Sequence, residues 1–182
     1  MKLDKLFNGL KQIANGDYVL EGDLICEEDL IIDLDDRLVV KGSIKVTKGI
    51  EAGWGIKAGE GIKAGEGIEA GCGIEAGWGI KAGEGIEAGC GIKAGCGIKA
   101  GWGIEAGWGI EAKSFIHAEK RIFAGLFIYH DSKNCKKTIK CAELRKGEIC
   151  YGDLVIEQPV IEMTVAEIEA KLGIKNLKIK EC

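Results

Sequence analysis

A six-residue repeat dominates this chain. From Ile50 the unit Ile-(Glu/Lys)-Ala-Gly-(Trp/Glu/Cys)-Gly recurs without a slip as far as Ile110. Weaker copies extend it upstream to Leu38 and downstream to Ile128. A repeat this short is typical of a β-solenoid, in which each unit forms one side of a coil. The repeat therefore predicts an all-β fold, a parallel β-helix of hexapeptide units.

The alternation within each unit predicts which side chains point inward. The six positions of the unit are called slots one to six here, counted from the isoleucine. Slots one and three share one face of a short strand because strand side chains alternate with period two. Both slots are apolar in nearly every copy, so Ile and Ala should face the core and the Glu or Lys of slot two should face outward. Slot five accepts Lys48, Trp54, Glu60 and Cys72, a tolerance expected of an exposed position. The two Gly slots flank it, where we expect corners with positive φ.

The order of the charges predicts three units per coil. Residues 18 apart would then stack about 4.8 Å from one another. One column reads Glu51, Glu69, Glu87 and Glu105, a second reads Lys63, Lys81 and Lys99 followed by His117, and a third alternates Lys57, Glu75, Lys93 and Glu111. Two units per coil give no such sorting. We expect a triangular solenoid of about five coils at this spacing.

The hand of the coil is less directly encoded. Left-handed hexapeptide helices of the acyltransferase type place a small residue two positions before the aliphatic one. Here the small residue follows the aliphatic one by two positions. This order resembles that of the right-handed helix of bactofilins, and the resemblance implies a right-handed coil, with the left-handed coil as the alternative.

Both ends of the repeat carry segments that we expect to cap the open strand edges. Residues 1–16 are predicted to form a capping helix that ends at Gly16, with an apolar face of Leu3, Leu6, Phe7, Leu10 and Ile13. Residues 17–130 are predicted to form the solenoid. Residues 131–182 are predicted to form an α/β cap, with short strands around Ile139 and Ile149 and a helix whose capping box is Thr164 and Glu167. Two caps favour a discrete particle over an endless filament.

The bulk composition excludes few functions. A net charge of −4 over 182 residues is too small to indicate nucleic-acid or membrane binding. No run reaches transmembrane length, and the start MKLDKLFNGLKQ lacks the apolar core of a signal peptide. Eight cysteines without a leader favour reduced thiols in a cytoplasm.

The glutamate column is the first candidate binding surface. Like charges stacked across a strand pair are destabilising, and the alternating third column avoids that cost. The functional interpretation is that Glu51, Glu69, Glu87 and Glu105 form an acidic ridge that docks on a basic groove, such as a nucleic-acid channel. The alternative is duplication, because the outward charges repeat as E-K-K-E-E-K with a 36-residue period.

The slot-five tryptophans are the second candidate surface. Trp54, Trp78, Trp102 and Trp108 should point outward, and exposed aromatic residues are favoured anchors at protein interfaces. We expect them to contact a partner or a second copy, gathering near the C-terminal coils with Phe123, Phe127 and Tyr129. The alternative is packing beneath the C-terminal cap.

Other residue sets indicate weaker possibilities. The lysine column, which Lys45 precedes, would suit phosphate contact or simply be solvated. Cys72 and Cys90 should lie on adjacent rungs, with Cys96 on the neighbouring side. His130, Cys135, Cys141 and Cys150 offer zinc-type ligands without a Cys-x-x-Cys pair. Neither of the two His lies beside an evident nucleophile, so we predict no enzyme activity, no catalytic residues and no cofactor or metal.

Two resemblances add expectations of function. The closing segment MTVAEIEAKLGIKNLKIKE resembles a C-terminal element of small accessory proteins from phages and prophages of Gram-positive bacteria. With the Gly-rich hexapeptide solenoid and the overall size, the chain resembles phage-encoded inhibitors of Cas9, the type II anti-CRISPR proteins. That resemblance implies a non-enzymatic protein in the host bacterial cytoplasm that binds the CRISPR effector nuclease, with or without its guide RNA, and blocks DNA cleavage.

The group shares no motif, so no functional residue is carried over from it. The repeat region also resembles bactofilin β-helices, which implies a self-assembling scaffold as the alternative function. A third hypothesis is an acyltransferase-like enzyme on a left-handed helix.

Overall fold

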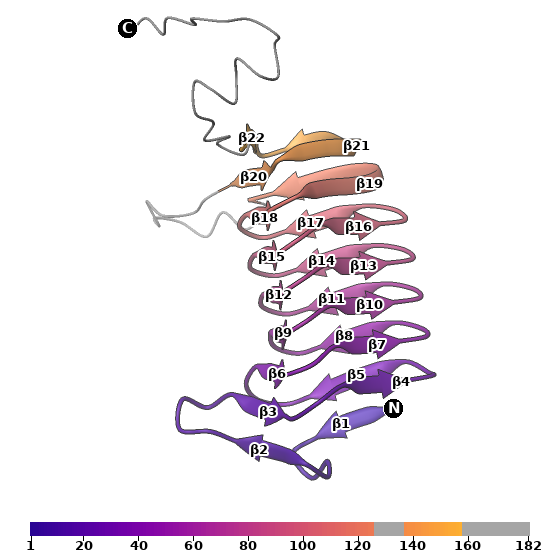
Figure 1. The fold of residues 1–182 in the computed structure, drawn as a ribbon, viewed down its shortest axis with the longest axis vertical. Coiled ribbons are helices and arrows are strands. Elements are labelled where there is room, and N and C mark those ends of the chain that lie inside the picture. Colours follow the sequence, from indigo (N-terminus) through magenta and orange to yellow (C-terminus); the bar gives the residue numbers. More distant parts are fainter. Residues whose placement is uncertain (126–136, 158–182) are drawn as a thin grey trace, which may run out of the picture.

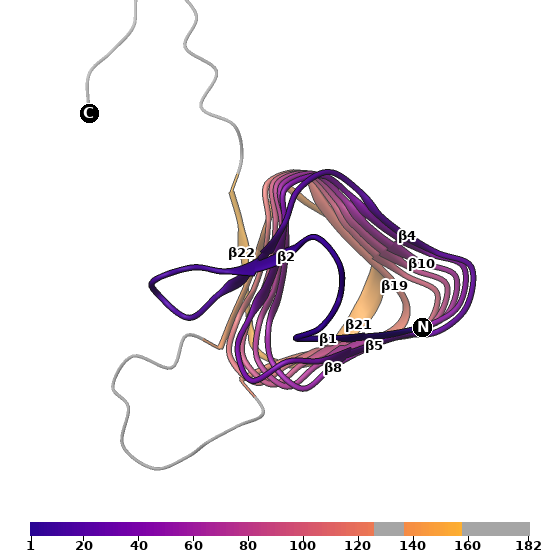
Figure 2. The same ribbon diagram turned by 90° about the horizontal axis from the view of Figure 1, so that it is seen from below.

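The structure is a parallel β-solenoid. It is a computed structural model that describes residues 1–125 and 137–157. Within these ranges every regular element is a strand, and the strands wind into about seven turns (Figure 1). The end-on view shows a triangular outline (Figure 2). The predicted fold class is confirmed, and the stack is longer than the five coils that the repeat alone indicated.

Each side of the triangle is a stack of short parallel strands, named here by its outward charges. The acidic face contains β1 (Lys2–Asp4), β5 (Leu30–Asp33), β8 (Ile50–Ala52), β11 (Ile68–Ala70), β14 (Ile86–Ala88) and β17 (Ile104–Ala106). The basic face contains β4 (Leu24–Cys26), β7 (Ile44–Val46), β10 (Ile62–Ala64), β13 (Ile80–Ala82) and β16 (Ile98–Ala100).

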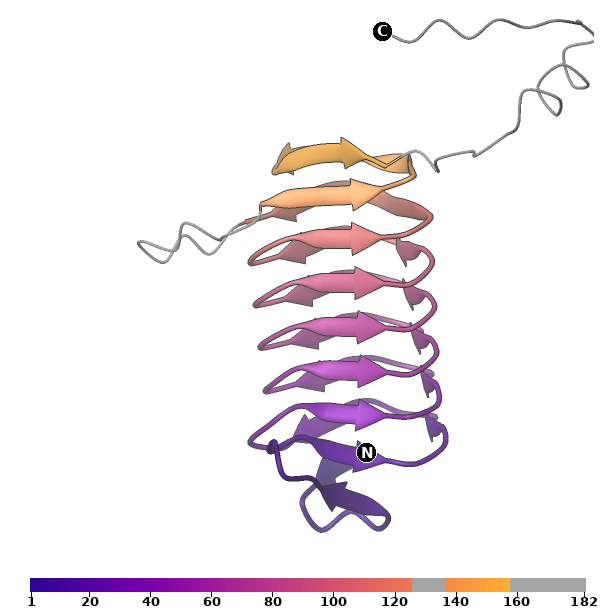
Figure 3. The same ribbon diagram turned by 60° about the vertical axis from the view of Figure 1, so that its left-hand side comes forward.

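The mixed face is the third side, and it comes forward in Figure 3. It contains β3 (Tyr18–Leu20), β6 (Leu38–Val40), β9 (Ile56–Ala58), β12 (Ile74–Ala76), β15 (Ile92–Ala94) and β18 (Ile110–Ala112). From the N-terminal end the chain passes through β3, β4 and β5 clockwise as it recedes (Figure 2). The coil is therefore right-handed, as the order of residues within the hexad favoured.

The register confirms three hexads per turn. Glu69 of β11 pairs with Glu51 on one side and Glu87 on the other, 18 residues away in each direction. The first turn is longer, because Leu30 pairs with Ile50 and Leu24 pairs with Ile44, 20 residues apart. From β6 onward the 18-residue step holds as far as the pairs of β16 and β17 with β19.

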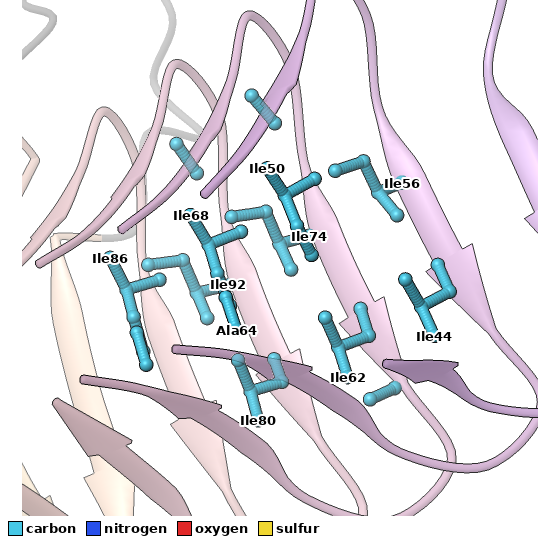
Figure 4. Packing of buried hydrophobic residues seen from close by; sticks show 14 of the residues in the cluster. Ile44, Ile50, Ile56, Ile62, Ala64, Ile68, Ile74, Ile80, Ile86 and Ile92 are labelled. Atoms are coloured by element: carbon cyan, nitrogen blue, oxygen red, sulfur yellow. The ribbon is translucent and has the colours of Figure 1, made fainter. Parts of the chain in front are cut away.

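The core consists of two residue types. Slot-one isoleucines from Ile44 to Ile122 are at most 2% exposed, and the slot-three alanines from Ala52 to Ala124 at most 4%. Figure 4 shows the isoleucines of successive coils in rows, as with Ile50, Ile68 and Ile86, which are register neighbours. Burial of such side chains contributes about 25 cal/mol per Å² of apolar surface, so each added coil repeats the same gain.

The glycine of slot four is required by close stacking and not by positive φ. Among the described residues, the glycines with positive φ are Gly9, Gly16, Gly22, Gly125, Gly147 and Gly152, all outside the regular hexads. A Cβ on Gly83 would overlap the carbonyl oxygen of Gly65 on the previous coil. Amide groups at the corners also bond between coils, as from Gly83 to the carbonyl of Ala64 at 3.2 Å. The expectation of positive φ at these corners was wrong.

The predicted N-terminal helix is absent and its residues form strands. β1 pairs in parallel with β5, and β2 (Leu10–Gln12) pairs in antiparallel fashion with β3. Leu3 is fully buried in β1, whereas Leu6 is 92% exposed and Ile13 45% exposed. The turns before and after β2 contain Gly9 and Gly16 at positive φ, each preceded by Asn, a pair that strongly favours turns. Two such turns, and an open sheet edge to pair with, override the helical spacing.

The C-terminal end of the stack is closed by longer strands. β19 (Phe115–Ala124) continues the basic face at Ile116–Ala118 and the acidic face at Ile122–Ala124. β21 (Glu143–Tyr151) pairs with β19, and β20 (Thr138–Cys141) pairs with β18 and with β22 (Asp153–Ile156). The strands predicted around Ile139 and Ile149 are therefore present. The helix predicted around Thr164 and Glu167 lies outside the described residues.

The stacking account predicts opposite effects for two neighbouring glycines. Gly83→Ala should lower the free energy of unfolding by about 1–3 kcal/mol, since the methyl group overpacks against the coil below. Gly85→Ala is the control, because its Cβ would meet nothing closer than the carbonyl oxygen of Gly103 at 3.8 Å. It should change the free energy little or raise it by up to about 1 kcal/mol. Urea unfolding of both variants measures the difference, and equal effects would contradict the account.

Candidate functional site

The four predicted glutamates form one continuous ladder on the acidic face. Glu51, Glu69, Glu87 and Glu105 are register neighbours on β8, β11, β14 and β17. The first three side chains are exposed and Glu105 is half-buried. This set is called the acidic ladder below. With about 4.8 Å between parallel strands, it places four carboxylates within about 15 Å.

An open furrow runs beside the acidic ladder. Its floor contains the slot-six glycines Gly49, Gly67, Gly85 and Gly103, whose lack of side chains leaves the backbone accessible. Asp29 lines one end and Trp102 the other, and the furrow encloses about 570 Å³. The surface is therefore a shallow groove with carboxylates along one side, suited to an extended basic partner rather than to an enclosed small molecule.

The charges of the acidic ladder are not neutralised within the described part of the chain. None of its four carboxylates forms an ion pair with another residue there. On the mixed face, by contrast, Lys57 pairs with Glu75 at 3.1 Å and Lys93 with Glu111 at 3.5 Å. The same backbone thus carries a self-neutralised column on one face and a free negative column on another.

The four tryptophans are exposed as predicted, but they do not form one patch. Their exposed fractions lie between 47% and 61%. Trp102 follows β16 and lines the acidic furrow, whereas Trp78 follows β12 and lines a furrow on the basic face. Trp54 and Trp108 share the corner between the acidic and mixed faces, three turns apart. Only Trp102 therefore adjoins the acidic furrow, and its ring is covered by the Lys120 ammonium group at 5.2 Å.

A second ladder of opposite charge lies on the basic face. Lys45, Lys63, Lys81 and Lys99 are register neighbours and all are exposed. This set is called the lysine ladder below. The furrow beside it encloses about 500 Å³ and is lined by glycines together with Trp78, Cys96 and Phe115. Lys45 lies 3.9 Å from Asp23, and no ion pair of the other three lysines is found within the described ranges.

Two exposed isoleucines were missed by the sequence reasoning. Ile31 of β5 precedes the acidic ladder and pairs with Glu51, and Ile25 of β4 precedes the lysine ladder and pairs with Lys45. Ile25 is 65% exposed and Ile31 45% exposed. The signal was present in the spacing, because Leu24 and Leu30 are six residues apart and place these isoleucines in slot two.

Some of the cysteines singled out in the sequence lie within the described residues. Cys72 and Cys90 lie on adjacent turns, and the amide of Cys90 donates to the carbonyl of Cys72 at 3.1 Å. Burial, followed by the neighbouring Cys72, raises the pKa of the Cys90 thiol. Of the zinc-type residues, His130 and Cys135 lie outside the described residues, Cys141 is buried and Cys150 is exposed. Within residues 1–125 and 137–157 no three His, Cys, Asp or Glu side chains converge as a metal site.

A charged cluster ties the last turn to the closing strand. The His117 ring nitrogen Nε2 lies 2.9 Å from Glu119 Oε1, and Lys146 of β21 forms an ion pair with the other oxygen of Glu119. Hydrogen bonding from Lys146, and then from His117, lowers the pKa of Glu119 from 4.5 to about 2. His117 is the register neighbour of Lys146 on the closing strand, so the basic face continues beyond the lysine ladder with a lysine that is paired to Glu119.

Comparison of the chain with protein-family models, with curated proteins and with solved structures found no match. The part of the chain that the structure describes contains no helix long and apolar enough to cross a membrane.

Neutralising one member of the acidic ladder should stabilise the protein. Glu87 lies between Glu69 and Glu105, so Glu87→Gln removes two like-charge contacts and should raise the free energy of unfolding by about 0.5 kcal/mol. Glu75→Gln is the control, because it breaks the ion pair with Lys57 and should lower that energy by about 0.3 kcal/mol. Chemical unfolding at low and high salt measures both. Changes in the free energy of unfolding that have the same sign in both variants and do not depend on salt would contradict the conclusion that the carboxylates of the acidic ladder are unpaired.

The cluster at Glu119 predicts a specific pH dependence. Because the folded-state pKa lies below the ordinary 4.5, the cluster stabilises the fold above that pH and loses its contribution as the pH falls through about 2. Lys146→Met should raise the pKa of Glu119, whereas Lys140→Met, which removes a contact to Glu157, should leave it unchanged. Carbon NMR titration of the Glu119 carboxyl group tests this, and an unshifted pKa in the first variant would refute the cluster.

Proposed function

We propose that this protein is a non-enzymatic inhibitor that docks its acidic ladder into the nucleic-acid channel of a host CRISPR effector nuclease of the Cas9 type. The observation that supports the proposal most is the free acidic ladder. Four stacked carboxylates remain without an ionic partner among the described residues, although the mixed face shows how the same repeat neutralises itself.

The spacing of the acidic ladder supports competition with nucleic acid. One strand of duplex DNA carries a negative charge about every 3.4 Å along its axis. The acidic ladder carries one about every 4.8 Å along a straight edge. A channel lined with Lys and Arg to hold a phosphate backbone would attract such an edge by the same long-range electrostatics.

The choice of nuclease class comes from the sequence. The resemblance of residues 163–181 to phage accessory proteins, with the hexapeptide solenoid and the chain length, favours an inhibitor of a bacterial defence nuclease. In the proposed mechanism the inhibitor occupies the channel, with or without guide RNA, and target DNA is then excluded. Trp102 at the end of the furrow would add an apolar contact.

The proposal predicts inhibition that depends on the acidic ladder. Added in slight excess to guide-loaded Cas9 at about 0.15 M salt, the protein should abolish cleavage of target DNA. Reversal of Glu69, Glu87 and Glu105 to Lys should weaken inhibition by roughly tenfold or more, since three favourable pairs become repulsive. The matched control reverses the exposed Glu21, Glu143 and Glu157 to Lys, which changes the net charge equally at positions that do not line the acidic furrow, and should inhibit like the parent.

Full cleavage, together with no co-elution of protein and nuclease, would refute the proposal. The alternative is a bactofilin-like scaffold that assembles through its coil ends. Sedimentation at the salt concentration of the cleavage assay distinguishes the two, because filaments sediment as a broad fast boundary and a discrete inhibitor does not.

A further inference from the structure

Each outward residue of the acidic face has a counterpart at the same level of the basic face. From the N-terminal end the outward residues of the acidic face are Ile31, Glu51, Glu69, Glu87 and Glu105, and those of the basic face are Ile25, Lys45, Lys63, Lys81 and Lys99. Each pair is six residues apart in sequence. Because both ladders belong to one solenoid, their rungs have the same spacing, and the longer 20-residue first step occurs in both.

The two isoleucines set the direction of the match. Among the aliphatic residues of strands β3 to β18 these two are exposed, Val39 is half-buried and the others are buried. A parallel alignment of two solenoids places Ile31 of one copy opposite Ile25 of the other and each Glu opposite a Lys. An antiparallel alignment would place each isoleucine opposite a charge, which costs desolvation without a partner. The match ends at the next rung, where Phe123 and His117 lie.

We propose that a second copy of this chain docks on the first, side by side with parallel axes, acidic ladder against lysine ladder and Ile31 against Ile25. The contact is heterologous, so a pair of copies keeps a free basic face on one copy and a free acidic face on the other. Association then continues beyond two copies until a ring closes or the chain of copies ends. This inference goes beyond the proposed function and does not depend on it.

The contact is expected to be weak and strongly dependent on salt. Exposed ion pairs each contribute little, and one face of five rungs is only about 20 Å long at about 4.8 Å per rung. Such a contact falls short of the roughly 1,600 Å² of surface buried in stable complexes. Four pairs in register nevertheless act together at low ionic strength, where charges attract over about 30 Å at 0.01 M salt but only about 3 Å at 1 M.

Sedimentation velocity of the full chain tests the docking directly. The weight-average sedimentation coefficient should rise with protein concentration at about 0.01 M salt and return to the monomer value at about 1 M. Ile25→Gln or Ile31→Gln should weaken the association several-fold without altering the charges. A monomer at every concentration in low salt, or association that salt does not reverse, would overturn the proposal.

A charge-swap pair makes the test specific to the two ladders. Variant A carries Glu69→Lys, Glu87→Lys and Glu105→Lys, and variant B carries Lys63→Glu, Lys81→Glu and Lys99→Glu. Each alone should associate at least roughly tenfold more weakly than the parent, because its two ladders repel. Mixed in equal amounts, A and B should associate again, since each supplies the charge that the other lacks. Circular dichroism checks that both are folded. Failure of two folded variants to associate when mixed would overturn the docking, whatever the outcome of the nuclease assay.

Discussion

Backbone hydrogen bonding between successive coils is the interaction on which the rest of this structure depends. Strands pair with strands 18 residues away, and the corner amides bond across the same gap, as from Cys90 to Cys72. From Gly59 to Gly101 a Cβ at slot four would lie within 2.2 Å of a carbonyl oxygen on the previous coil, which explains the glycine at these positions. The repetition of glycine in these units is thus a consequence of the same close approach at successive corners.

Because of the stacking, residues that recur at a fixed interval in the sequence form straight lines on the surface and in the core. A residue type that recurs every 18 positions becomes a straight line of side chains, whatever its chemistry. Isoleucine lines become the core, and Glu and Lys lines become charged ladders on two different faces. The like-charge lines cost stability, and the mixed face shows that alternation avoids that cost. We therefore interpret the ladders as binding surfaces whose partners are opposite charges of similar spacing.

The parts that the sequence predicted are those that a strict period determines. Turn length, inward and outward faces and the glutamate column follow from identical neighbours repeating, so each local choice agrees with the next. The ends do not repeat. At the N-terminal end the spacing of Leu6 and Ile13 matched the apolar face of a helix, but the Asn-Gly turns favour strands, and both side chains are exposed. The exposure of the tryptophans was predicted, but their distribution over three different corners was not. A residue's position in slot five predicts exposure, whereas its corner depends on which of the three units of a turn it belongs to.

The stacking of residues 18 apart is tested most directly by cross-linking. A variant with Glu69→Cys and Glu87→Cys should form an intramolecular disulfide on mild oxidation, because strands on adjacent turns bring the two positions within the Cα separation that a disulfide spans, about 4.4–6.8 Å. A variant with Glu69→Cys and Lys81→Cys, which a coil of two hexads would bring together, should not. Peptide mass spectrometry identifies the bonded positions. A bond between positions 69 and 81, with none between 69 and 87, would contradict the three-hexad turn.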